Sequence, residues 1–326
     1  MTTTDSERSW QPSASLDVMQ RRAKLLYDIR EFFQARDVLE VDTPVLSRAA
    51  NTDANIDSLQ LTEQQQDWYL HTSPEFPMKR LLASGSGDIY QVCKVFRQGE
   101  QGQLHNPEFT MLEWYRCGYS LQDLMDEVAE LITQLADKDV LLDAALQLSY
   151  QDAFQTYLKI DPFESDTEQL RACATSADIA DAATLQLNKD GWLDLLLSML
   201  IVPQFPENKL VLLHHYPASQ AALASLDAND PRSALRFELF INGVEIANGY
   251  DELSDADELQ KRFEQDNAHR ENQEKAIMPI DYALLEAQQA GLPQCAGVAM
   301  GLDRLLLLLS GATELSEVLA FDASRA

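Results

Sequence analysis

Residues 92 to 116 read VCKVFRQGEQGQLHNPEFTMLEWYR and predict a strand, a loop and a second strand. Alternation along the second strand places four side chains on one face: Phe109, Met111, Glu113 and Tyr115. An ionised Glu113 among large apolar neighbours would lose its hydration unless a cation met it. We therefore predict that this face borders a binding cleft, with a barely exposed edge strand as the alternative.

The composition is that of a globular protein with an acidic surface. The chain has 326 residues with 45% hydrophobic content, which can bury the core of one large domain or two modest ones. Lys and Arg number 25 against 53 Asp and Glu, a formal charge of -28. Such a charge opposes the phosphate neutralisation on which nucleic-acid affinity depends, so a dedicated RNA or DNA binder is disfavoured, although a local basic patch remains possible.

Cysteine and histidine spacing gives no support for a zinc site or a disulfide framework. The four cysteines form no CxxC and the five histidines form no HExxH. The first fifteen residues lack an apolar signal core, and the apolar runs elsewhere are too short for a membrane span. We predict a soluble, cytoplasmic protein with reduced thiols and no membrane partner.

The N-terminal region predicts a helix followed by a strand. Residues 1–15 are rich in Ser and Thr and are expected to form a flexible N-terminus. Residues 17–36 carry the apolar stripe of an amphipathic helix. Residues 38–43 alternate as a strand, which Pro44 ends because it has no N–H to donate. This pair is either a dimer element or an ordinary packing unit within one domain.

Two further segments have helical patterns. Ser73 is a predicted N-cap, with Pro74 at the first helical position and Glu75 in the first turn. An acidic first turn is favourable without any ligand, so Glu75 has a structural explanation beside a functional one. Residues 120–200 are acidic and rich in Ala and Leu, and predict a helical insertion packed on the sheet, in which we find no chemistry.

Residues 236–253, RFELFINGVEIANGYDEL, predict a hairpin with Asn242-Gly243 as its two-residue turn. Pairing from that turn sets Glu238 opposite Ala247, so that Glu238 and Glu245 share one face as diagonal neighbours. A bound divalent cation would relieve their repulsion, and Mg²⁺ suits carboxylates that also meet phosphates. A solvated outer face is the alternative, and a bulge would change the faces.

A glycine-containing loop precedes the last apolar helix. In CAGVAMGLDR, residues 295–304, Gly297 and Gly301 permit close backbone approach. Arg304 falls in the first turn of the helix, where a cation opposes the macrodipole. This placement indicates that Arg304 meets an anion.

Taken in order, these segments resemble the three signature motifs of class II aminoacyl-tRNA synthetases, in particular the lysyl branch. The resemblance implies an α+β fold, an antiparallel sheet flanked by helices, over residues 16–326. The helix and strand ending at Pro44 would be motif 1 and the interface of a homodimer. Residues 96–116 would be motif 2, and residues 297–304 would be motif 3.

The resemblance also implies a role for each motif residue. Arg97 would bind the amino-acid carboxylate and the α-phosphate of ATP, and Phe109 and Arg304 would stack on the two faces of adenine. Glu238 and Glu245 would bind Mg²⁺ and, with Arg97 and Arg304, form the catalytic set. The ATP site would also include Glu100, His105 near the triphosphate, Asn106 and Gly301. The lysine pocket would be formed by Glu75, Arg97, Glu113, Tyr115, Asn248, Glu252 and Ala299.

Three carboxylates around a substrate suit a diamino acid and reject neutral side chains, which would leave charges desolvated and unpaired.

Two departures from the lysyl branch refine the prediction. Ala299 stands where lysyl-tRNA synthetases carry glycine, a change shared by the elongation factor P lysine ligase family. Motif 2 reads Arg97-Gln98-Gly99-Glu100 instead of Arg-x-Glu, so Glu100 or a backbone carbonyl would meet the adenine amino group.

The expected absence of an anticodon-binding barrel before the core, together with the acidic charge, also resembles the elongation factor P lysine ligases. The predicted function is ATP-dependent activation of (R)-β-lysine or lysine as an adenylate and transfer to a lysine of elongation factor P, without stable nucleic-acid binding. The alternatives are a truncated lysyl-tRNA synthetase acting on tRNA and a non-catalytic lysine sensor. Retention of the two arginines and the metal pair argues against a sensor.

Overall fold

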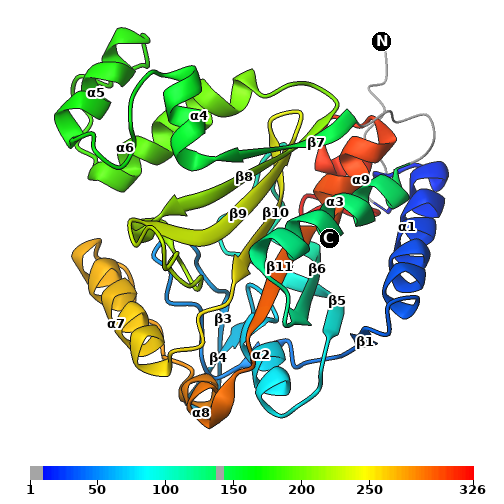
Figure 1. Ribbon diagram of the computed structural model, residues 1–326. Coiled ribbons are helices and arrows are strands. Elements are labelled where there is room, and N and C mark those ends of the chain that lie inside the picture. The colour runs from blue at the N-terminus through cyan, green and yellow to red at the C-terminus, as the bar shows by residue number, and fades with distance from the viewer. Residues whose placement is uncertain (1–9, 137–142) are drawn as a thin grey trace, which may run out of the picture.

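The computed structural model describes residues 10–136 and 143–326. A large sheet runs through its centre (Figure 1), and all of its neighbouring strand pairs except the outermost pair at each edge are antiparallel. The outermost pair at each edge is parallel. In spatial order the strands are β1 (Leu39–Glu40), β5 (Ile89–Phe96), β6 (Glu108–Cys117), β11 (Cys295–Gly301), β10 (Val244–Asp251), β9 (Ser233–Ile241), β8 (Lys209–Pro217) and β7 (Asp143–Ser149).

Helices cover the sheet unequally. On one face, the largest buried cluster joins the sheet to α1 (Leu16–Gln34), α3 (Leu121–Leu135) and α9 (Leu302–Ser310), which lie together in Figure 1. Three other helices, α2 (Glu75–Ala83), α7 (Ala256–Asn272) and α8 (Tyr282–Gly291), lie in the lower part of Figure 1. The second face of the central strands borders a cleft, which is lined by residues of β6, β10 and β11.

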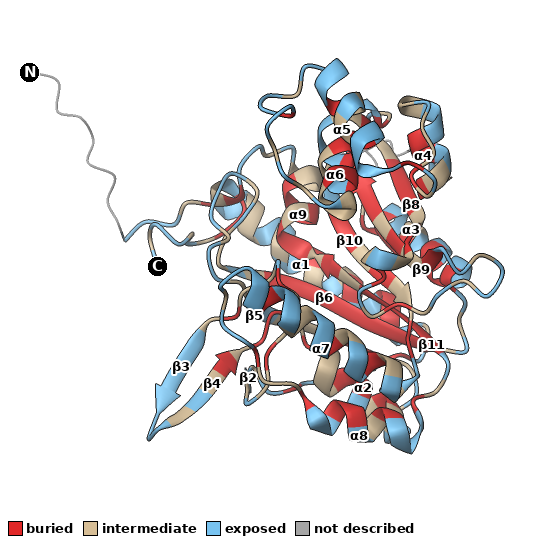
Figure 2. Ribbon diagram, turned by 90° about the vertical axis from the view of Figure 1, so that its left-hand side faces the viewer, coloured by how far each residue is buried: buried red, intermediate tan, exposed pale blue. Residues whose placement is uncertain are grey.

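A small second sheet projects from the body. It contains β2 (Leu46–Ser47), β4 (Gln66–Leu70) and β3 (Gln60–Glu63), and β3 is exposed along its whole length (Figure 2). Over residues 10–136 and 143–326, no helix is both long enough and apolar enough to cross a bilayer.

The alternation predicted for the second strand of residues 92–116 is confirmed in β6. Leu112 and Trp114 are buried in the main core, whereas Met111, Glu113 and Tyr115 line the cleft on the other face. The fold is the predicted α+β arrangement, with an antiparallel sheet flanked by helices.

Two element boundaries differ from the prediction. The strand expected at 38–43 is reduced to β1, because it lies at the edge of the sheet and only β5 pairs with it. Helix α2 begins at Glu75, so Pro74 and not Ser73 occupies the N-cap position, although the Ser73 side chain still caps the first helical N–H. The Ser73 hydroxyl accepts from the Glu75 N–H at 3.0 Å and donates its own proton to Glu113 at 2.7 Å.

The region from 120 to 200 is only partly the helical insertion that was expected. Helix α3 belongs to the main core, and β7 forms an edge of the central sheet. The remaining helices, α4 (Tyr150–Tyr157), α5 (Thr167–Ser176) and α6 (Lys189–Leu196), build a separate apolar cluster against β8. These three helices form the visible lobe at the upper left of Figure 1.

A flexible N-terminus was predicted for residues 1–15, of which residues 1–9 lie outside the described residues. The part that is described belongs to the fold. Ser13 and Ala14 donate backbone hydrogen bonds to Ala320 and Leu319 at 2.9 and 3.1 Å, and Ala14 is buried.

The hairpin is present, with a β-bulge. Asn242 and Gly243 have positive φ angles of 50° and 76°, as a two-residue hairpin turn requires. Glu245 pairs with Phe240, but a register shift before Ala247 sets Glu238 opposite Asn248 instead of the predicted Ala247. The extra residue is accommodated because Ile246 and Ala247 are both buried in the core.

Candidate active site

All of the predicted site residues line one cavity of about 1320 Å³ on the open face of the sheet. They are Glu75, Arg97, Glu100, His105, Asn106, Phe109, Glu113, Tyr115, Glu238, Glu245, Asn248, Glu252, Ala299, Gly301 and Arg304. The bulge in β10 makes this possible. Without it, Glu245 and Asn248 would point to opposite faces, whereas both now border the cavity.

Glu113 lies at the floor of the pocket. Its carboxylate accepts hydrogen bonds from the Ser73 hydroxyl and the Tyr115 hydroxyl, both at 2.7 Å. Burial first, and then the charge of Glu75, raise the pKa of Glu113 to about 7. Ala299 lies between Glu113 on β6 and Asn248 on β10 in the strand register, so its methyl group borders both side chains.

A buried lysine, Lys79, joins two of the pocket carboxylates, and the sequence pattern did not indicate it as a site residue. Lys79 Nζ lies 2.6 Å from Glu75 Oε1 and 2.6 Å from Glu252 Oε2. Burial acts to lower the pKa of Lys79, but Glu252 and Glu75 together raise it above its usual value. Burial raises the pKa of Glu252 to about 8, and Lys79 opposes that rise. The i,i+4 spacing of Glu75 and Lys79 was a signal that could have indicated the contact.

Gly297 is required by close packing at the same place. A Cβ atom at this position would lie 2.3 Å from Tyr115 Cε1 and 2.5 Å from Glu252 Oε1. At Gly301 a Cβ would meet only the Ile246 carbonyl, at 3.9 Å, so close backbone approach is found at the first glycine and not at the second.

Glu238 and Glu245, the predicted metal pair, both line the cavity. Glu238 accepts from the Tyr216 hydroxyl at 2.7 Å and pairs with Arg236. Desolvation in the cleft, followed by the charge of Glu238, raises the pKa of Glu245, although 45% of its side chain remains accessible. Because no cluster of three or more His, Cys, Asp or Glu suited to a metal occurs in the described part of the chain, this pair could supply only part of a coordination shell.

Arg304 and Arg97 bring guanidinium groups to the cavity. Arg304 donates to His105 Nε2 at 2.8 Å and to the Glu245 carbonyl at 3.0 Å, and so bridges the motif 2 loop and β10. Burial and then Arg304 lower the pKa of His105, which favours its neutral form. Arg97 lies over the Phe109 ring at 5.1 Å and reaches Glu100 only at 3.5 Å.

The remaining predicted residue has a structural role. Asn106 Nδ2 donates to the Glu108 carbonyl at 2.6 Å, and Asn106 Oδ1 accepts from the Ala323 N–H at 3.0 Å. Its side chain therefore ties the motif 2 loop to the C-terminal segment, while the residue still borders the cavity.

Helix α6 contributes two acidic residues that the sequence analysis did not assign. Asp194 accepts from Gln220 at 2.8 Å and Asp190 accepts from the Ser219 hydroxyl at 2.6 Å, and both border the cavity. Burial raises the pKa of Asp194 to about 6. No local pattern indicates this arrangement, because it depends on the docking of α6 against the loop after β8.

Comparison with known proteins identifies the class. The family model described as tRNA synthetases class II (D, K and N) matches residues 9–325. The chain belongs to this family, which confirms the resemblance seen in the three motifs.

Among curated proteins, the chain is similar to the elongation factor P--(R)-beta-lysine ligases of Salmonella paratyphi B and Salmonella schwarzengrund. Each is 46% identical over 324 residues, which is 98% of either chain. The protein of the same name from Salmonella arizonae is 45% identical over the same share.

Proposed function

We propose that this protein activates (R)-β-lysine with ATP and transfers it to a lysine side chain of elongation factor P. The observation that carries the proposal is a single cavity lined both by the carboxylates of Glu75, Glu113 and Glu252 and by the guanidinium groups of Arg97 and Arg304. Such a cavity suits a diamino acid joined to a nucleotide. The names of the 46% identical relatives give the substrate and the acceptor.

At the nucleotide end, Arg97 is assigned to the amino-acid carboxylate and the α-phosphate. Its buried Nε atom has no hydrogen-bond partner, and its contact with Glu100 is long, so the guanidinium is available to an anion. Phe109 and Arg304 would enclose the adenine ring, with Glu100 near its amino group. His105, held by Arg304, would lie beside the triphosphate.

Glu238 and Glu245 are assigned to Mg²⁺. Two carboxylates near phosphate oxygens fit this ion, which keeps water and phosphate ligands in such sites. When bound, it would offset negative charge on the phosphates. The protein itself positions Glu238 through Tyr216 and Arg236, so the carboxylate is oriented before any ligand arrives.

At the amino-acid end, Glu75, Glu113 and Glu252 would receive the two ammonium groups, with Tyr115 and Asn248 as hydrogen-bonding neighbours. A neutral side chain would leave these carboxylates buried without a partner, which supplies the selectivity. Ala299, between Glu113 and Asn248, takes up space that glycine would leave open, and we assign to it the preference for the β-amino isomer.

The reaction would occur in two steps. The substrate carboxylate attacks the α-phosphorus in line, forming the acyl–phosphate bond as pyrophosphate leaves, while Arg97 stabilises the charge on the transferring group. The neutral amine of the acceptor lysine then attacks the acyl carbon, forming an amide as AMP leaves and the amine releases one proton to solvent. The side chains of the cavity orient the reactants and offset charge, and none of them forms a covalent bond in this scheme.

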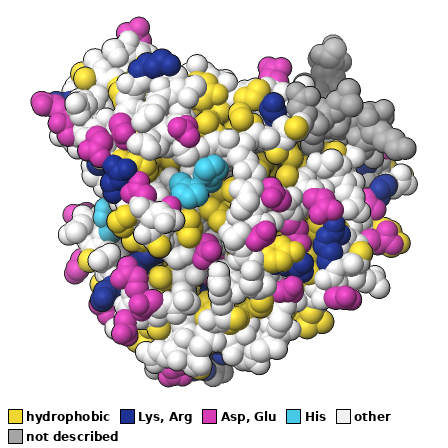
Figure 3. All heavy atoms as spheres, in the orientation of Figure 1, with side chains coloured by type: hydrophobic (Ala, Val, Ile, Leu, Met, Phe, Trp, Pro, Cys, Tyr) yellow, Lys and Arg dark blue, Asp and Glu magenta, His cyan; other side chains and the backbone are white. Residues whose placement is uncertain are grey.

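The acidic surface agrees with a protein acceptor in place of a stable nucleic-acid partner. On the face shown in Figure 3, Asp and Glu side chains are scattered widely, and Lys and Arg occur in separate spots. The formal net charge of the whole chain is -28. Phosphate backbones bind poorly to such a surface.

We also propose a homodimer through α1 and the segment from β1 to Pro44. Tyr27 on α1 is 59% exposed and Leu39 on β1 is 55% exposed. These large apolar side chains lie on the elements that correspond to motif 1. Burial against a second copy would remove them from water.

A transfer experiment tests the function. The purified protein is incubated with ATP, Mg²⁺, (R)-β-lysine or lysine, and either elongation factor P or tRNA, and the products are weighed by mass spectrometry. The proposal expects a mass increase on the factor, larger with the β isomer. Charged tRNA would select a synthetase, and unmodified acceptors in both reactions would select the sensor.

A further inference from the structure

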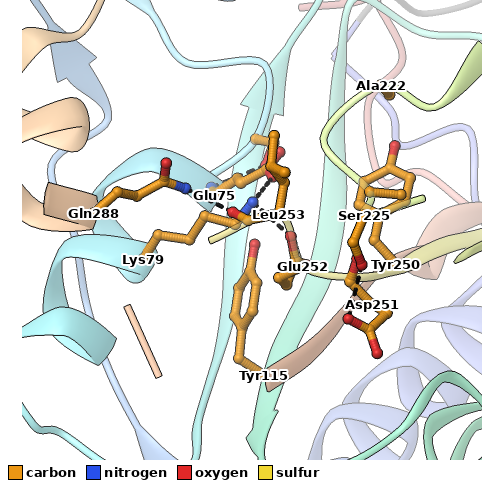
Figure 4. A network of polar contacts seen from close by, with 12 residues as sticks. Glu75, Lys79, Tyr115, Ala222, Ser225, Tyr250, Asp251, Glu252, Leu253 and Gln288 are labelled. Atoms are coloured by element: carbon orange, nitrogen blue, oxygen red, sulfur yellow. Dashed lines mark hydrogen bonds and ion pairs between the residues drawn. The ribbon is translucent and has the colours of Figure 1, made fainter. Parts of the chain in front are cut away.

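Lys79 occupies an unusual position for a lysine. Its side chain is 1% exposed, as is that of Glu252, and its ammonium group lies between two carboxylates. Figure 4 shows it running from α2 toward Glu252, with the Tyr115 hydroxyl close by. Lys79 itself is absent from the cavity wall, whereas its partners Glu75 and Glu252 both line the cavity.

Packing and a hydrogen bond hold Lys79 and Glu252 in place. Met78 and Leu82, on the same helix, are packed in a buried cluster with Tyr115 and Cys295. Gln288 on α8 donates to the Leu253 carbonyl at 2.9 Å and so holds the backbone immediately after Glu252. The charges are therefore placed by rigid elements, which is the arrangement that a preorganised site needs.

Stability alone is a poor explanation for this arrangement. Removing two ions from water costs several kcal/mol for each, and apolar side chains of similar volume commonly fill such places without loss. Here one lysine is kept behind two carboxylates, with the third carboxylate, Glu113, in electrostatic contact with Lys79 and Glu75.

The count of charges agrees with the proposed substrate. When Glu75, Glu113 and Glu252 are ionised and Lys79 is charged, three negative charges and one positive charge leave a net charge of minus two. A diamino acid brings two ammonium groups, and its carboxylate would go to Arg97. Without Lys79 the pocket would carry one negative charge more than the substrate can neutralise.

We propose that Lys79 is a positioning residue that sets the charge of the amino-acid pocket. It orients Glu75 and Glu252 through its two ion pairs, and when the three pocket carboxylates are ionised it leaves two negative charges for the two ammonium groups of the substrate. This inference rests on the proposed function, and it assigns to Lys79 no contact with substrate.

The test compares Lys79→Met, Glu252→Gln and the double variant. By the same count, the net charge of the pocket is minus three in Lys79→Met, minus one in Glu252→Gln and minus two in the double variant. We expect kcat/KM for (R)-β-lysine in ATP–pyrophosphate exchange to fall at least about 100-fold in each single variant, mainly through KM. The double variant should recover at least about tenfold over either one.

Lys261→Met is the matched control, because Lys261 is 65% exposed and lies 4.0 Å from its partner Glu258. Its exchange activity should equal that of the wild type. Circular dichroism and thermal melting check that each variant is folded. If Lys79→Met does not fold, the comparison of the double variant with Glu252→Gln decides, because the double variant removes both partners of the buried pair.

A purely structural role for Lys79 predicts that the double variant recovers thermal stability but not KM. A double variant whose KM is no better than that of the single variants therefore overturns the assignment while leaving the function intact. Absence of exchange in the wild-type protein with both lysine isomers overturns the proposed substrate, and this assignment with it.

Discussion

Replacing Gly297 with alanine should disable the amino-acid pocket. The new Cβ would lie 2.3 Å from Tyr115 Cε1, whereas ordinary contacts begin at 3.4 Å, so the ring must retreat by about 1 Å. Tyr115 is buried and its hydroxyl is bonded to Glu113, so the displacement passes to a pocket carboxylate. Overpacking of this kind costs about 1–3 kcal/mol of unfolding free energy, and a misplacement of about 1 Å can lower the rate about 100-fold.

The assay is ATP–pyrophosphate exchange with (R)-β-lysine, together with denaturant unfolding of the same preparation. Gly102→Ala is the control, because nothing lies within 4 Å of a Cβ at that position, and its activity should match the wild type. Wild-type exchange and wild-type stability in Gly297→Ala would contradict the packing on which the pocket depends.

Four further predictions concern individual side chains. Because the pKa values of Glu113 and Glu252 are raised to about 7 and about 8, binding of a diammonium ligand at pH 7 should release protons from these carboxyl groups. The ligand should also bind more tightly as pH rises through that range, until its own amines lose their charge. Equal binding heats in buffers of different ionisation enthalpy would count against this. Arg97→Ala should abolish exchange, and an unchanged rate would refute its role. Glu238→Gln should raise the Mg²⁺ concentration for half-maximal exchange at least about tenfold, and an unaltered Mg²⁺ titration would argue against a metal ligand. Ala299→Gly should improve kcat/KM for lysine relative to the β isomer, and an unchanged ratio would remove it from specificity.

Local geometry explains which parts of the fold were predictable. Alternation in residues 108–117 placed Glu113 and Tyr115 on the cleft face because the strand period is fixed by the backbone. The Asn242-Gly243 turn predicted both strands of the hairpin for a similar reason. The bulge at Ile246 could not be predicted, since it depends on space in the core that helices distant in sequence create.

The site shows the same division between local and tertiary signals. Arg304 was indicated because a cation in the first turn of a helix opposes the macrodipole. Glu238 and Glu245 were indicated because two like charges on one face of a hairpin repel each other. Lys79 was missed because an i,i+4 pair with Glu75 is common on exposed helices, and only the arrival of Glu252 from another element makes it a buried network. Asp194 reaches the cavity through the docking of α6, which no local pattern indicates.

The most direct test of the central claim is exchange of labelled pyrophosphate into ATP by the purified protein. The account predicts exchange that requires Mg²⁺ and a diamino acid, and that is faster with (R)-β-lysine than with lysine. If neither diamino acid supports incorporation of label above the rate without amino acid, then this cavity does not form an aminoacyl-adenylate, and the account is wrong.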